Sequence, residues 1–294
     1  MKIATGRTKA YRIVCLIIMI VLAILFLFPL YWILTGSVKT MAAINSTTPE
    51  WFPHTFTMRN YAELFSRRSA PLFELFGAEV GRVPGAIRWL LNTVFMAVMA
   101  MILTCVTASM AGYALAKKRF FGRTLLFSLI VAAMALPKQV ILIPLIREIS
   151  ALNLYDNIWA VIFPTVGWPF GVFLMKQFSE SIPGEMLEAA KIDGAGEIRT
   201  FTSVVVPLIK PGIGALAIFT FINSWNDYFM QLIMLTSSKN LTISLGIATM
   251  QAENSTDYGL IMAGAALAAV PIIIVFLIFQ KYFTKGITMG AVKG

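Results

Sequence analysis

The sequence contains few of the residues on which metal sites and disulfide frameworks depend. It has only two cysteines, Cys15 and Cys105, and because both lie within apolar segments they support neither a disulfide framework nor a CxxC metal site. His54 is the only histidine, and a single histidine is more typical of a surface residue than of a ligand. Charged residues make up 13% of the chain, whereas a typical soluble domain has about 25%. We therefore expect no metal site.

Motifs that bind nucleotides are also absent from the sequence. No GxxxxGK[ST] occurs, so the chain lacks the usual loop that cradles ATP phosphates. Gly194-Ala195-Gly196 has neither the further glycine nor the preceding strand of a dinucleotide site and is predicted to be a turn. No nucleophile lies in a pattern with a base. We therefore expect no catalytic residue and no cofactor in this chain, which is not predicted to be an enzyme.

Apolar residues are abundant. They form 58% of the chain, and the mean hydropathy is +0.79. Six runs reach the length of about 20 residues that crosses a hydrocarbon core: 13–34, 89–112, 124–146, 157–178, 212–235 and 258–283. The alternating pattern of a membrane barrel is absent. The predicted fold class is therefore all-α, a polytopic membrane protein with six transmembrane helices. The first run is too long for the apolar core of a signal peptide and is expected to stay uncleaved.

Basic residues give the chain a net charge of +10 and indicate its topology. They gather at the ends of the apolar runs rather than in a stripe with interleaved aromatics, so nucleic acid is not an expected partner. The positive-inside rule favours cytoplasmic N- and C-termini. With six spans, this orientation places the loop 179–211 in the cytoplasm.

That loop has the pattern of a short helix pair. Asp193-Gly194 is expected to end a first helix, and a second is expected to run through Glu197, Ile198 and Arg199. The apolar residues of the loop are bounded by charges: Met186, Leu187, Ala190 and Ile198. The pattern alone leaves two interpretations open, docking to a cytoplasmic partner or resting on the lipid surface.

Within the loop, Glu188-Ala189-Ala190, three further residues and Gly194, followed by Val204 to Pro207, resemble the EAA motif of ABC-importer permeases. Val204 and Val206 are a mild departure from that motif. Four more segments resemble the carbohydrate-uptake branch, and within it the second, smaller maltose-type permease subunit: 108–116, 136–144, 225–227 and 285–294. The resemblance covers about 89–294 strongly and 10–60 loosely. Residues 65–87 look like an insertion.

The resemblance implies a permease subunit in a bacterial inner membrane that moves a carbohydrate into the cytoplasm. It implies four kinds of partner: a homologous permease, two cytoplasmic ATPases that bind ATP and Mg, an extracytoplasmic solute-binding protein and membrane lipid. The residues implied to contact the ATPase are Glu188, Ala189, Ala190, Asp193, Gly194 and Ala195. Three regions follow: 1–88 with the first span and a long outer loop, a core at 89–285, and a cytoplasmic tail at 286–294.

Polar residues within predicted spans are functional candidates because burying them in a membrane is costly. Lys138 and Asp227 lie at equal depths in the third and fifth runs, so an ion pair between them is possible. They form either a structural pair or part of the transport path, where Lys138 would suit an acidic saccharide such as an alginate-like uronate oligomer. The other path candidates are Gln139, Trp168, Asn223, Trp225 and Asn226. The tryptophans are suited either to stacking on sugar rings or to ordinary packing.

The alternative function is an ATP-independent secondary transporter or channel. Such a carrier would not need the EAA helix pair, and it would more often carry coupling-ion carboxylates within inverted repeats. Only Asp227 has the required position and charge. A membrane-embedded enzyme is a more distant alternative, since no polar catalytic cluster is present.

Overall fold

The computed structural model describes residues 9–75, 78–253 and 257–291. Parts of three predicted regions lie outside the described residues: 1–8 of the N-terminal tail, 76–77 of the insertion and 292–294 of the C-terminal tail. The chain forms two compact units, which we describe separately. Unit 1 comprises Met1–Ser69 and Ile247–Ala269, and unit 2 comprises Ala70–Gly246 and Val270–Gly294.

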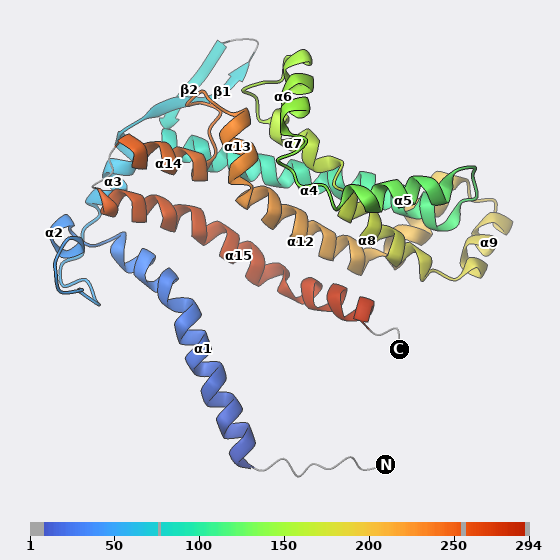
Figure 1. The fold of residues 1–294 in the computed structure, drawn as a ribbon, viewed down its shortest axis with the longest axis horizontal. Coiled ribbons are helices and arrows are strands. Elements are labelled where there is room, and N and C mark those ends of the chain that lie inside the picture. The colour runs from blue at the N-terminus through green and yellow to red at the C-terminus, as the bar shows by residue number, and fades with distance from the viewer. Residues whose placement is uncertain (1–8, 76–77, 254–256, 292–294) are drawn as a thin grey trace. The chain divides into compact units, whose positions relative to one another are not determined.

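Unit 1 begins with three helices, drawn in blue in Figure 1: α1 (Lys9–Gly36), α2 (Met41–Ile44) and α3 (Arg59–Ser66). Asn60 of α3 ties the end of α1 in place, because its buried side-chain amide donates to the carbonyl oxygens of Ser37 and Lys39, each at 2.9 Å. Two later helices extend across the boundary between the units: α14 (Ile243–Glu253) and α15 (Tyr258–Ala291).

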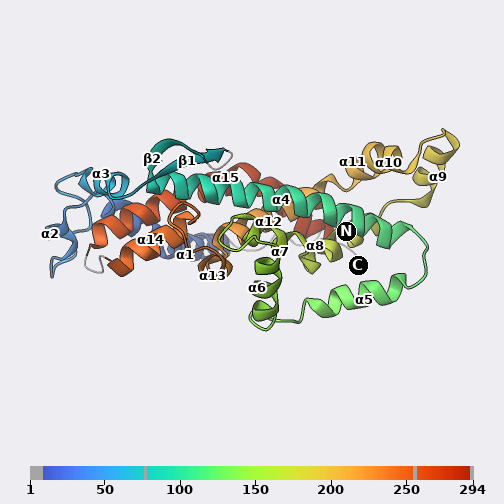
Figure 2. The same ribbon diagram turned by 90° about the horizontal axis from the view of Figure 1, so that it is seen from above.

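Unit 2 contains most of the helices. They are α4 (Gly85–Lys117), α5 (Arg123–Ala133), α6 (Leu142–Ala151), α7 (Trp159–Val166), α8 (Pro169–Glu180), α9 (Gly184–Ile192), α10 (Glu197–Thr200), the π-helix η1 (Phe201–Val205), α11 (Val206–Leu208), α12 (Lys210–Asn226) and α13 (Tyr228–Met234). Both ribbon views show α4 running along α8 and α12, with which it has its most extensive contacts (Figures 1 and 2).

A two-stranded sheet of β1 (Ser69–Leu75) and β2 (Ala78–Pro84) lies within the predicted insertion 65–87. The sequence had not predicted these strands. Gly81 adopts a φ of 65°, which a glycine reaches without steric cost. The mostly helical architecture confirms the predicted class, and the two-stranded sheet is an exception to a strictly all-α fold.

Among the described residues, four helical segments are long and apolar enough to cross a membrane, one of them made up of α7 and α8 together. They lie at Tyr11–Gly36, Gly85–Lys117, Trp159–Glu180 and Tyr258–Gln280, at the positions of the first, second, fourth and sixth predicted runs. A fifth crossing is possible if α10–α11 and α12, bent by 78° relative to one another, form one span. The number of six spans therefore stays a prediction, as does the side of the membrane on which the termini lie.

The third predicted span, 124–146, was wrong as a continuous helix. Helix α5 ends at Ala133, turns follow, and α6 begins at Leu142. Pro137 lies within this interruption, where its ring disfavours the helical conformation of the residue before it. The fourth run is also divided, at Gly167 and Trp168, and the fifth at Asp227.

The core of unit 2 depends on close approach between α4 and α8. A Cβ atom at Gly112 would lie 2.6 Å from the backbone of Met175 and Lys176. Gly212 of α12 lies equally close to a side chain, since a Cβ atom added there would be 2.5 Å from the ring of Phe178. Small residues at such positions let helices pack backbone to backbone, as is common in membranes.

Replacing Gly112 with alanine is expected to destabilise unit 2, because the atoms that a methyl group would meet belong to rigid backbone. Overpacking of this kind costs about 1–3 kcal/mol. Thermal unfolding of the detergent-purified protein measures the effect. Gly184→Ala is the matched control, since a Cβ there meets no atom within 4 Å. Equal thermal midpoints for the two variants would contradict this account of the packing.

Candidate functional site

Three interruptions of apolar helices meet at one place in unit 2. The turn between α5 and α6 contributes Lys138 and Ile141, the break before α8 contributes Trp168, and the break before α13 contributes Asp227. Irregular backbone at membrane depth leaves N–H and C=O groups without helical partners, so it is tolerated only within protein or along a polar cavity. The meeting of three breaks therefore marks a candidate site.

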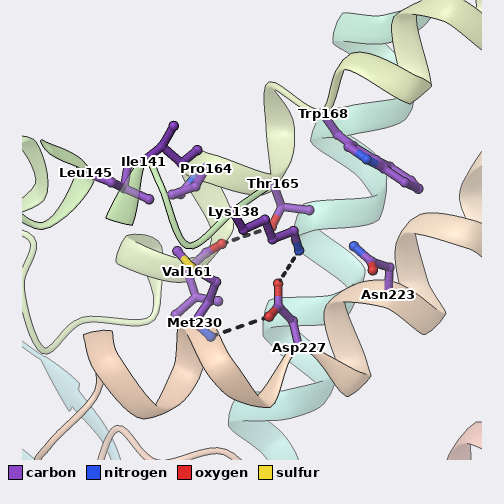
Figure 3. A pocket seen from close by; sticks show the side chains of 10 residues that line it. All are labelled: Lys138, Ile141, Leu145, Val161, Pro164, Thr165, Trp168, Asn223, Asp227 and Met230. Atoms are coloured by element: carbon purple, nitrogen blue, oxygen red, sulfur yellow. Dashed lines mark hydrogen bonds and ion pairs between the residues drawn. The ribbon is translucent and has the colours of Figure 1, made fainter. Parts of the chain in front are cut away.

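A small cavity of about 70 Å³ lies among these breaks. Figure 3 shows Lys138, Thr165, Trp168, Asn223 and Asp227 as its polar and aromatic lining. The remaining lining is apolar: Ile141, Leu145, Val161, Pro164 and Met230. A small-molecule site usually has this composition, with a few polar groups on an otherwise apolar wall.

Lys138 and Asp227 form the ion pair that their equal depth had made possible. The Lys138 ammonium donates to a carboxylate oxygen of Asp227 at 2.7 Å (Figure 3). The lysine side chain is 50% exposed, whereas the aspartate side chain is 12% exposed. Asp227 also caps α13, with its other oxygen 3.4 Å from the Met230 amide. The aspartate is thus held by its own helix, and the lysine is the more accessible partner.

The other predicted path residues divide into two groups. Trp168 and Asn223 line the cavity with the ion pair. Trp225 is buried, with its ring 5.6 Å from that of Phe221, and the Asn226 amide donates to the Ile222 carbonyl at 2.9 Å. Neither residue lines the cavity, and nor does the exposed Gln139.

Thr165 is a lining residue that the sequence did not predict. Its hydroxyl donates to the Val161 carbonyl at 3.1 Å, a bond to the preceding turn of its own helix. Its position directly after Pro164 and close to a helix break could have identified Thr165 in the sequence. Hydropathy alone treats this threonine as part of an apolar run.

The predicted helix pair is present between α8 and α12. Helix α9 ends at Ile192 with Asp193 as its C-cap, and Gly194 follows with a φ of 73°. The Gly194 amide donates to the Lys191 carbonyl at 3.0 Å and the Ala195 amide to the Ala190 carbonyl at 2.9 Å. These two bonds form a Schellman motif, which requires the left-handed residue that glycine supplies. Helix α10 then begins at Glu197, as the sequence predicted.

Two adjacent lysines at the end of α4 hold this helix pair. Lys117 donates to the carbonyl oxygens of Glu180 and Ile182, at 3.1 and 2.6 Å, where the chain leaves α8. Lys118 forms a salt bridge with Glu197 at the start of α10. Partial burial alone would lower the pKa of Lys118, but hydrogen bonds to Glu197 and Tyr113 outweigh it and raise the pKa.

The same salt bridge acts on the carboxylate. The hydrogen bond from Lys118 lowers the pKa of Glu197 below its usual value. Both shifts favour the charged forms, so the pair is ionised at neutral pH and links α4 to α10.

The surface of the helix pair is exposed and partly apolar. Ile192 is 86% exposed and Ile198 is 82% exposed. Among the predicted coupling residues, Glu188, Ala189, Asp193 and Gly194 are exposed, Ala195 is half-buried, and Ala190 is buried. Ala190 therefore packs within the chain, while the other residues present a small-residue surface bordered by the two isoleucines.

Several membrane-length helices, a cavity with an ion pair at their breaks and a charged helix pair define the class of a membrane transport subunit. Residues 107–289 match the family described as binding-protein-dependent transport system inner membrane component. The chain belongs to this family and is a multi-pass inner membrane component of an ABC transporter.

Several transport permeases are similar to this chain over almost the whole length of both proteins. The arabinooligosaccharides transport system permease protein AraQ of Bacillus subtilis (strain 168) is 32% identical, over 97% of this chain and 97% of its own. The sulfoquinovosyl glycerol transport system permease protein SmoH of Agrobacterium fabrum is 33% identical, over 91% and 89%. The melibiose/raffinose/stachyose import permease protein MelC of Bacillus subtilis is 32% identical, over 98% and 99%.

The fold is also similar to that of a solved protein. A chain in the crystal structure of a bacterial ABC transporter involved in the import of the acidic polysaccharide alginate has a TM-score of 0.76 and 22% sequence identity. The match covers 96% of this chain and 100% of that one. At this identity the similarity establishes the fold.

Replacing Gly194 with alanine is expected to strain the turn between α9 and α10, because a Cβ atom is disfavoured at a φ of 73°. The expected cost is about 1–2 kcal/mol. Thermal unfolding measures it, with Gly196→Ala as the control, since Gly196 has a φ of −68° and open space around it. If both variants unfold at the wild-type temperature, the left-handed turn is not a stability requirement.

Proposed function

We propose that this chain is the permease subunit of an ATP-driven importer that moves a carbohydrate into the cytoplasm. The observation that carries the proposal is the cavity at three helix breaks, where Lys138, Trp168, Asn223 and Asp227 converge. Hydroxyl-rich ligands suit such a wall, because charged and amide groups hydrogen-bond hydroxyls and an indole ring packs on apolar sugar faces. Relatives whose names specify oligosaccharide transport support the same substrate class.

The size of the cavity supports a second permease as partner. Sites for small molecules are usually about 300–1,000 Å³, and this cavity holds about 70 Å³. It provides one wall of a path, and a homologous permease subunit would provide the opposite wall. The half-exposed Lys138 is the side chain best placed to face that partner.

Two helices connect the cavity with the helix pair. Helix α8 begins beside Trp168 and ends at Glu180, where the pair starts. Helix α12 begins at Lys210, after the pair, and ends beside Asp227. A displacement of the pair would therefore be carried along both helices to the cavity.

This connection supports ATPase docking at the helix pair. The surface of the pair suits a cleft on a cytoplasmic protein. Ala189 and Gly194 would let the partner's atoms come close to the backbone, while Glu188 offers a carboxylate and Ile192 an exposed apolar side chain. The permease would then hold no cofactor and catalyse no reaction, since two ATPase subunits would bind ATP and Mg. A solute-binding protein would deliver the sugar, and ATP with the loaded binding protein would favour the outward-facing state.

The charge of the substrate depends on what the Lys138 ammonium does beyond its bond to Asp227. A lysine has three N–H donors, so one that is 50% exposed can bind a substrate carboxylate or hydroxyl while it stays paired. An acidic saccharide would make use of the positive charge, whereas a neutral one would need only the donors. The acidic-substrate hypothesis therefore makes a distinct prediction for charge removal.

Lys138→Met is expected to reduce transport at least tenfold, because it removes the donor and leaves the carboxylate of Asp227 without its cation. Breaking a fully buried ion pair costs about 3–5 kcal/mol, and the cost is smaller here because the lysine side chain is 50% exposed. Substrate-stimulated ATPase activity of the reconstituted complex is measured with acidic and neutral saccharides. A larger loss for the acidic saccharides is expected if the substrate is acidic. Equal loss for both would refute the acidic-substrate hypothesis. Arg147→Met on α6 is the control for loss of an exposed cation.

Ala189→Trp is expected to abolish co-purification of the ATPase, because it places a large ring on the exposed docking surface without straining the turn at Gly194. Affinity purification through a tag on this chain measures the amount of bound ATPase. Ser150→Trp, an exposed site on α6, is the control for the added ring.

A wild-type protein that brings down no ATPase would overturn the docking proposal. It would favour the alternative, an ATP-independent secondary transporter or channel. Uptake that continues after ATP is depleted would distinguish that alternative from an inactive preparation.

A further inference from the structure

Unit 1 contains a second cavity, of about 270 Å³, near the C-terminal end of α1. Its lining combines the ammonium group of Lys39 with the aromatic rings of Trp32 and Tyr258, the small polar side chain of Ser46 and the acidic residue Glu50. All of these residues belong to unit 1, and none of them is used by the transport path or by the helix pair. The transport function does not account for this cavity.

Lys39 is the unusual residue in this cavity. It is 2% exposed, and lysine is almost never fully buried unless it is paired. Its ammonium donates to the Glu50 carbonyl and lies 4.4 Å from the centre of the Trp32 ring. Among the described residues no carboxylate forms a salt bridge with it, and the Glu50 carboxylate accepts instead from the His54 amide at 2.6 Å. A lysine has three donors, so the group retains capacity for an anion.

The depth of Lys39 in the membrane identifies the type of anion. No charged residue lies between Arg12 and Lys39, and the apolar window of α1 has no residue buried within this chain. The two basic residues thus bracket the hydrocarbon-spanning part of α1. Lys39 lies three residues beyond Gly36, the last residue of that helix, so an α1 that spans the bilayer would place it where phospholipid headgroups begin.

Aromatic residues around the end of α1 support this depth. The rings of Phe28, Trp32 and Trp51 contact one another with centroids about 6 Å apart. The Tyr31 hydroxyl donates to the Trp51 carbonyl at 2.5 Å, which fixes the following loop against α1. Trp51 is 56% exposed. Tryptophan and tyrosine gather in this way at the interface between lipid and water.

We propose that this cavity binds the phosphate of an anionic phospholipid headgroup, with Lys39 as the cation. Basic pockets between membrane helices bind such headgroups on the cytoplasmic side, and a buried ammonium beside α1 offers the same chemistry at the predicted outer end of this helix. The volume of about 270 Å³ has room for a phosphate and part of its glycerol. Tyr258 and Met262 at the start of α15 form the opposite wall, so a bound lipid would join the two membrane-spanning segments of unit 1.

The test uses the full-length protein, purified in mild detergent with any subunits that remain bound. Native mass spectrometry measures the fraction of the chain that carries phosphatidylglycerol after the lipid is added. Removing one cation at a membrane surface costs about fivefold in lipid affinity, and Lys39→Met is expected to lose at least that much. Lys39→Arg is expected to retain binding. Arg59→Met, which removes an exposed cation from the same unit, is the matched control.

A second variant covers the case in which Lys39→Met fails to fold. Ala43→Phe fills the cavity from α2 without altering the lysine, and it is expected to lose bound phosphatidylglycerol as well. Glycerophosphoglycerol and inorganic phosphate, which carry the anion without acyl chains, are expected to bind far more weakly. Wild-type lipid binding in both variants would overturn the proposal. Equal binding of free phosphate and lipid would also overturn it, by showing a site for a soluble anion.

Discussion

The constraint on which this structure depends is the cost of an unpaired backbone group in hydrocarbon. Each N–H or C=O group without a partner there costs several kcal/mol, so a membrane helix does not end inside the bilayer without reason. Unit 2 interrupts helices at 134–141, at Gly167–Trp168 and at Asp227, and it gathers all three interruptions around one cavity. The ion pair between Lys138 and Asp227 then joins two of them across 2.7 Å.

The rest of unit 2 keeps this arrangement rigid and connects it to the surface. Helix α4 is uninterrupted from Gly85 to Lys117 and packs against α8 and α12 (Figures 1 and 2). Gly112 allows close approach of α4 to α8, and Lys117 and Lys118 hold the helix pair at the same end of α4. One continuous helix therefore contacts both of the helices that connect the pair with the cavity.

Much of this fold could be predicted from hydropathy and turn chemistry. Long apolar runs located α1, α4 and α15, and Asp193-Gly194 correctly marked the end of α9. Equal depth along two runs brought Lys138 and Asp227 into consideration as a pair. Each of these inferences uses only the composition of a segment or the position of a residue along it. Tertiary packing did not change the outcome in these cases.

The remaining features depend on tertiary structure. A hydropathy sum treats Pro137 and Lys138 as minor interruptions, although the chain leaves the helix there. Trp225 lies one residue from Asn226 and two from Asp227, yet the helix turns its ring into the core. The sequence between the strands 69–75 and 78–84 contains no Asn-Gly or Asp-Gly to reveal them. Which side of a helix faces a cavity is decided by its neighbours and not by its own sequence.

The central claim is that the cavity at the helix breaks lines a water-filled path. Thiol accessibility tests it directly, after Cys15 and Cys105 are replaced by serine. A cysteine introduced at Asn223, which lines the cavity, is compared with one at Leu129, which is 59% exposed on α5. A charged thiol reagent should modify Asn223→Cys much faster than Leu129→Cys in the membrane-embedded complex, and a transported saccharide should slow the reaction. Equal rates at the two positions, or no effect of any saccharide, would contradict the account.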